Sequence, residues 1–162
     1  MRLCALASAL VCASLLASSP ASSQNAPPSY GAPIQLAAAK KAAAAAEAHA
    51  ISKGWTMAIV IVEPSGDMVY FEKMDDTQYG SIKVAINKAT SAAMFRRPTQ
   101  VFNDLIAKGA EFAYLHQLQG ANAVPGGFPI VVGGKIVGGI GCSGGTGAQD
   151  SEVCKAGIDA LK

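Results

Sequence analysis

The chain has 162 residues, of which 51% are hydrophobic, and its 13 basic and 11 acidic side chains give a formal net charge of +2. This length suits one domain with a single hydrophobic core. The near-neutral charge, with no basic block and no basic–aromatic alternation, is not the pattern of a nucleic-acid-binding protein, so we expect no nucleic-acid partner.

Residues 1–23 have the pattern of a secretory signal peptide. Arg2 precedes an apolar run over residues 3–17, which is too short to span a bilayer comfortably. The best small-x-small cleavage site is 21–23, so Gln24 is the expected first mature residue. We therefore predict an exported protein, periplasmic or secreted. A buried N-terminal helix is the weaker alternative.

The four cysteines fall into two groups. Cys4 and Cys12 lie in the predicted signal peptide, and neither follows the Leu-small-small run of a bacterial lipoprotein, so we expect no membrane anchor. Cys142 and Cys154 remain in the mature chain, without the C-x-x-C spacing of a redox or metal site. In an oxidising compartment, a disulfide between them and two buried thiols are both compatible with the sequence.

The globular domain is expected to begin with a helix. Residues 24–35 are rich in proline and small side chains and are interpreted as a flexible lead-in, which leaves 36–162 for the domain. Residues 36–53 are dense in alanine and have strong helix propensity, and Gly54 is expected to end that helix.

A hairpin and two helices are expected next. The β-branched, apolar segment 56–63 predicts a strand buried on both faces, and 68–74 predicts its hairpin partner. Ser81 is expected to cap a helix that ends before Pro98. Pro98 suits the first turn of a further helix that ends at Gly109.

A second hairpin and a last helix complete the pattern. Segment 110–128 gives no clear periodicity, whereas 129–142 predicts two strands joined by the Gly133-Gly134 turn. Thr146 and Gln149 form a predicted capping box for the last helix. The order αββααββα, with hairpins in place of crossovers, indicates an α+β domain with an antiparallel sheet flanked by helices.

The segment Gly139–Gly144 matches G-x-G-x-x-G but lacks the context of a nucleotide-binding loop. Such a loop needs a second parallel strand after its helix, with an acidic residue about 20 positions on, and too little chain follows Gly144 for both. Asp150 and Glu152 lie in the first turn of the following helix, where they would repel a phosphate. We therefore do not expect nucleotide binding.

Glycines on one face of the last strand have a simpler explanation. Gly139 and Gly141 share a face, and glycine in a strand marks the close approach of a backbone or a ligand. We expect the Ala156-Gly157 surface of the last helix to pack there, and a ligand groove is the weaker alternative.

No catalytic set is visible in the sequence. His49 and His116 lie far apart and lack the spacing of zinc ligands. No nucleophile–base pair can be assigned, and Ser143 has the wrong offset for a nucleophile elbow. The residues alone therefore favour a protein that is not an enzyme.

Four separated blocks resemble the GlcG/HbpS family of haem-binding, sometimes called haem-degrading, proteins, which includes the C-terminal domain of PduO-type adenosyltransferases. The resemblance covers residues 36–161. The blocks are Gly80-Ser81, Phe95–Thr99, Pro125–Gly127, and Ser143–Gly147 followed by Gln149-Asp150. Family members usually carry an apolar residue in place of Cys142 and a small one in place of Cys154, and the joint departure favours a disulfide.

The resemblance implies a profilin-like three-layer α/β/α fold around a five-stranded antiparallel sheet, one strand more than the two hairpins supply. It also implies homo-oligomers, ring-like or octameric, and haem or a related tetrapyrrole as ligand. Sequestration, sensing and slow degradation of haem are the corresponding functions. The alternative is a non-haem oligomeric accessory, or small-molecule-binding protein, that supports a periplasmic dehydrogenase or transport system.

Three residues are candidates for the haem site. His49 is the candidate axial ligand, because the short side chains of Ala42–Ala46 before it would let a flat macrocycle approach. A solvated histidine on the helix flank is the alternative. Arg96 and Arg97 could pair with the propionates, with carboxylates at a subunit contact, or with helix carbonyls. Thr99 is interpreted as a helix cap.

Overall fold

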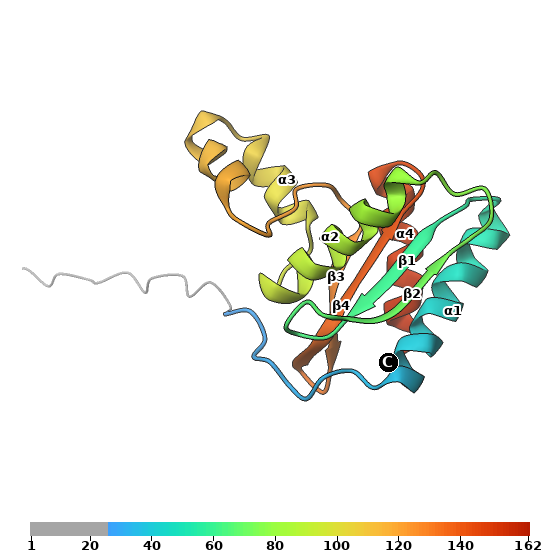
Figure 1. Ribbon diagram of the computed structural model, residues 1–162. Helices are drawn as coiled ribbons and strands as arrows, with labels where there is room; N and C mark the ends of the chain where they lie inside the picture. Colours follow the sequence, from blue (N-terminus) through green and yellow to red (C-terminus); the bar gives the residue numbers. More distant parts are fainter. Residues whose placement is uncertain (1–25) are drawn as a thin grey trace, which may run out of the picture.

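The structure is a computed structural model that describes residues 26–162, so the predicted signal peptide lies outside the described residues. Within this part of the chain, no helix has the length and apolar character needed to cross a membrane. The elements in chain order are α1 (Leu36–Lys53), β1 (Ala58–Val62), β2 (Met68–Lys73), α2 (Gly80–Met94), α3 (Gln100–Ile106), the 3-10 helix η1 (Ala110–Gln117), β3 (Gly127–Val132), β4 (Lys135–Ser143) and α4 (Gly147–Asp159) (Figure 1).

The sheet is antiparallel and has four strands in the order β2-β1-β4-β3. The α+β class and the two hairpins are confirmed, whereas the expectation of a fifth strand is wrong. Segment 110–128, which has no clear periodicity, contains η1, a loop and the first residues of β3. The sheet therefore gains no fifth strand from this segment.

Part of the predicted lead-in lies against β4. Because β1 ends at Val62, opposite Gly139, the earlier residues of β4 have no β1 partner on that edge. Ile136 forms two backbone hydrogen bonds with the lead-in segment. Its N–H donates to the carbonyl of Ser29, and its carbonyl accepts from the N–H of Gly31. Only an isolated parallel bridge results, between Tyr30 and Ile136.

Helices cover both faces of the sheet, which gives three layers (Figure 1). Alternate residues of β1 point to opposite faces, as a strand requires, and all are fully buried. Ile59 and Ile61 join the core under α1 and α4, whereas Val60 and Val62 join the smaller core under α2.

The glycine face of β4 packs against a different helix from the expected one. A Cβ atom at Gly139 would lie 2.5 Å from the carbonyl oxygen of Ala89, and one at Gly141 would collide with the carbonyl oxygen of Ala85. Both alanines belong to α2, so α2 and not α4 approaches this face. Gly157 of α4 instead allows close contact with α1, where its Cβ would lie 2.8 Å from the carbonyl oxygen of Ala42.

Helix ends follow the sequence in some places and depart from it in others. Gly54 ends α1 in the left-handed conformation, and Thr146 forms the predicted capping box with Gln149. Ser81 does not cap α2: it lies buried in the first turn and accepts a hydrogen bond from the Gln78 side chain. The helix after Pro98 begins later than predicted, at Gln100, and together with η1 it projects from the body of the domain (Figure 1).

Candidate functional site

The glycine loop after β4 is occupied by a side chain of the protein itself. The backbone N–H groups of Gly144 and Gly145 donate to one carboxylate oxygen of Asp150, at 3.1 and 3.0 Å. Asp150 is almost completely buried in the first turn of α4. A phosphate would need these same N–H groups, so their role here is to hold the loop on α4.

The counter-charge of Asp150 is the fully buried Lys88 of α2. Its Nζ lies 2.6 Å from the second Asp150 oxygen and donates to the carbonyl of Cys142 at 3.0 Å. Burial lowers the pKa of the Lys88 ammonium from its usual range, and the hydrogen bond to Asp150 opposes that shift. This pair was not predicted from the sequence, although Lys88 falls on the same helix face as Ala85 and Ala89.

The blocks that carry the family resemblance converge on this interior. Thr99 does not act as a helix cap: its hydroxyl donates to the carbonyl of Val124 and accepts from the N–H of Gly127. A Cβ atom at Gly126 would lie 3.0 Å from Lys88 Nζ. Thr99, Gly126 and Gly127 therefore serve the scaffold, because their polar groups and close contacts lie within the interior.

A disulfide joins Cys142 of β4 to Cys154 of α4, with their Cα atoms 5.7 Å apart. The structure thus pairs the two cysteines that the family resemblance marked. Both residues are fully buried, next to Lys88 and Asp150. The bridge fastens the last helix to a central strand of the sheet.

His49 lies near the end of α1 within a cluster that also contains Lys53, Trp55 and Glu152. Its Nε2 lies 2.9 Å from a Glu152 carboxylate oxygen, and Lys53 Nζ lies 2.9 Å from the same oxygen. Hydrogen bonds from Lys53 and His49 lower the pKa of Glu152, so this carboxylate is ionised at neutral pH. The His49 side chain is 27% exposed and meets the Trp55 ring edge-on.

The predicted alanine platform before His49 is only partly available. Ala42, Ala43 and Ala46 are fully buried against the core, since they face inward on α1. On the outer side of the helix, Ala44 and Ala48 are exposed. Of the expected stretch only Ala44 is exposed, and Ala48 adds a second exposed alanine next to His49.

Arg96 and Arg97 lie beyond the end of α2 and are held by aromatic rings. The Arg96 guanidinium lies 5.7 Å from the Tyr30 ring centre, and the Arg97 guanidinium lies 5.7 Å from that of Phe102. Arg97 also donates to the carbonyl of Phe95, which is the kind of contact that the helix-carbonyl alternative describes. No hydrogen bond, ion pair or ring contact in residues 26–162 joins either arginine to His49.

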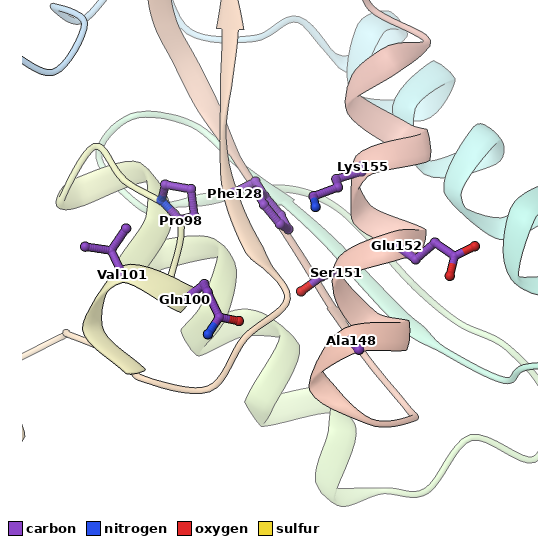
Figure 2. Close-up of a pocket in the computed structure, with 8 residues that line it drawn as sticks. All are labelled: Pro98, Gln100, Val101, Phe128, Ala148, Ser151, Glu152 and Lys155. Atoms are coloured by element: carbon purple, nitrogen blue, oxygen red, sulfur yellow. The ribbon is translucent and has the colours of Figure 1, made fainter. Parts of the chain in front are cut away.

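An open pocket of about 540 Å³ lies on the other side of α4 from His49. It is lined by Pro98, Gln100, Val101, Phe128, Ala148, Ser151, Glu152 and Lys155 (Figure 2). Among the residues that the structure describes, no group of three or more His, Cys, Asp or Glu side chains could hold a metal ion. His116 is exposed on η1, away from the other candidates.

Comparison with known proteins gives a family match over most of the chain. The family model described as "Haem degrading protein HbpS-like" matches residues 34–159. An uncharacterized 15.0 kDa protein from the dhaT-dhaS intergenic region of Citrobacter freundii is 34% identical over 131 residues, which are 79% of this chain and 92% of that protein. Protein GlcG of Escherichia coli is 33% identical over 100 residues, 62% of this chain and 73% of GlcG.

Solved structures share the fold. A double mutant of HbpS from Streptomyces reticuli superposes with a TM-score of 0.75 at 26% identity, covering 90% of this chain and 99% of that one. The chain of a PduOC–haem complex superposes with a TM-score of 0.73 at 24% identity, covering 80% of this chain and 96% of that one. The first similarity extends to sequence, and the second concerns the fold.

Proposed function

Because the chain belongs to the HbpS-like family of haem-degrading proteins, we propose that it binds haem or a related tetrapyrrole, for haem sequestration, sensing or slow degradation. The observation that carries the proposal is the accessible imidazole of His49. Neutral imidazole is a common axial ligand of haem iron, and bound haem would supply the open coordination position on which redox or oxygen chemistry depends.

The surroundings of His49 fit a flat, anionic ligand. The exposed Ala44 and Ala48 place two short side chains on the outer side of α1, where Lys40 and Lys41 are also exposed and could meet an anionic ligand. The Glu152 carboxylate contacts both His49 and Lys53. It would therefore still be paired with the Lys53 ammonium if the His49 imidazole rotated toward the haem iron. Trp55 limits the rotation of the ring from one side. His49 thus lies on a helix surface that can hold the face of a macrocycle.

Hemin titration tests this assignment. We expect His49→Ala to lower hemin affinity by about tenfold or more and to shift the Soret maximum, because the axial ligand is lost. His116→Ala, a matched change at an exposed histidine on η1, should leave both unchanged. Joint replacement of Arg96 and Arg97 should weaken binding less than His49→Ala, since propionates can remain solvated.

The same hemin titration distinguishes haem binding from the non-haem accessory role. Equal binding by the wild-type protein and His49→Ala would remove His49 from the proposal. A wild-type protein without a saturable Soret band at micromolar hemin would contradict haem binding. The accessory role beside a periplasmic dehydrogenase or transport system would then be favoured.

The proposal also includes export and assembly into a homo-oligomer larger than a dimer. The signal-like pattern of residues 1–23 and the disulfide in the mature domain both support an oxidising compartment. We expect protein from the periplasm or medium to begin at or near Gln24 by N-terminal sequencing, and to scatter light as more than a dimer. An intact Met1 on folded cytoplasmic protein would contradict export, and a monomeric mass would contradict assembly.

A further inference from the structure

The pocket beside α4 has an aromatic wall and one uncompensated cation. Phe128 of β3 forms the wall, with Pro98 and Val101 beyond it and the α4 side chains of Ser151 and Lys155 on its other side (Figure 2). The Lys155 ammonium lies 5.6 Å from the Phe128 ring centre. Figure 2 shows both side chains directed into the space between α4 and α3, whereas the Glu152 carboxylate points away from it.

The nearby carboxylates are occupied elsewhere. Glu152 pairs with Lys53 and His49 on the far side of α4. Asp159, one turn beyond Lys155, pairs with Lys162 at 2.6 Å. In the part of the chain that the structure describes, no carboxylate lies within ion-pair distance of Lys155. Lys155 is therefore the one charged side chain of the described lining without an ion-pair partner, since the Glu152 carboxylate is paired with Lys53 and His49.

The remaining polar atoms of the lining are acceptors. The amide nitrogen of Gln100 donates to Asn103 and Asp104, which leaves its carbonyl oxygen free. The hydroxyl of Ser151 donates to the carbonyl of Gly147, so its oxygen can still accept a hydrogen bond. A ligand that satisfies all these groups has an anion, a flat apolar body and an O–H or N–H donor.

We propose that the pocket between Phe128 and Lys155 binds a planar aromatic carboxylate that also carries a hydroxyl or amino group. The ring stacks against Phe128, the carboxylate pairs with Lys155, and the donor reaches the oxygens of Gln100 and Ser151. The groups that would contact this ligand are not those assigned to haem, although Glu152 lies at the edge of both sites, and the proposal goes beyond the proposed function.

Titration calorimetry with a hydroxynaphthoate ion tests the site, with the uncharged hydroxynaphthamide as matched ligand. We expect saturable binding of the carboxylate by the wild-type protein. Affinity should fall by about tenfold for the amide and for Lys155→Met, because each change removes one half of the ion pair. Lys108→Met, at an exposed lysine beyond α3, should bind like the wild-type protein.

Two further variants complete the test. Phe128→Leu keeps an apolar side chain but removes the ring, and it should weaken binding by about threefold or more. His49→Ala should bind the carboxylate unchanged, so failure of haem binding does not affect this result. The proposal is overturned if the wild-type protein does not bind at millimolar carboxylate, if the amide binds equally well, or if Lys155→Met retains full affinity.

Discussion

Replacement of Lys88 by methionine is expected to lower the free energy of unfolding by about 3–5 kcal/mol. The change leaves the Asp150 carboxylate buried without its counter-charge. Asp150 also holds the N–H groups of Gly144 and Gly145, so the loop between β4 and α4 would be weakened with it. Urea denaturation followed by circular dichroism measures the loss.

Two comparison variants make this result specific. Lys83→Met alters an exposed lysine on the same helix and should change stability by less than about 0.5 kcal/mol. Adding Asp150→Asn to Lys88→Met removes the orphaned charge and should recover part of the loss, because the amide oxygen can still accept from the glycine loop. If Lys88→Met is no less stable than Lys83→Met, the buried pair does not have the role assigned to it.

Gly141→Ala is expected to destabilise the protein by about 3 kcal/mol or more. The added Cβ collides with the carbonyl oxygen of Ala85 and lies 2.5 Å from the backbone nitrogen of Ala89. Both contacts are with the backbone of α2, so relief requires the whole helix to move away from β4. Such a shift would open the core under α2, where Val60 and Ala89 are fully buried.

Gly80→Ala is the matched control for this change. A Cβ atom at Gly80 meets nothing within 4 Å, and the residue lies in the first turn of α2. Its stability should stay within about 0.5 kcal/mol of the wild-type value or rise slightly, since alanine is the better helix former. Thermal or urea unfolding with equal losses for the two variants would contradict the close packing of α2 on β4.

The elements with strong local sequence signals, such as α1 and the second hairpin, were predicted correctly from the sequence. The alanine-rich segment gave both bounds of α1, since helix propensity and the stop at Gly54 agree. The Gly133-Gly134 turn placed the second hairpin, because both glycines adopt positive φ. The helix after Pro98 was predicted, but α3 is shorter than expected and ends at Ile106. The 3-10 helix η1 was not predicted, because its segment has no clear periodicity.

Long-range contacts account for the other differences. Nothing in the sequence distinguishes a glycine face that receives α2 from one that receives α4, because both helices present small residues. Lys88 was overlooked because a lysine normally lies at the surface, and its partner Asp150 is 62 residues away. The cysteine pair was easier to identify, since one resemblance marked both positions.

The candidate haem residues were predicted individually but not as a group. His49 is accessible, as an axial ligand must be, yet its partners come from α4 and could not be seen in the sequence of α1. Arg96 and Arg97 contact the rings of Tyr30 and Phe102. From residue type alone, His49, Arg96 and Arg97 were expected to share one haem site. In the fold, the two arginines contact aromatic rings and not His49.

The central position of β4 has a consequence for the order in which the chain becomes structured during synthesis. Both β1 and β3 pair with β4, and α2 packs on its glycines, yet this strand is made after all three. Until it leaves the ribosome, the first hairpin has only α1 and α2 to pack against, and a two-stranded hairpin is by itself marginally stable in water. The four-stranded sheet can therefore form only after β4 has been made, so we expect the core of the domain to be completed late in synthesis.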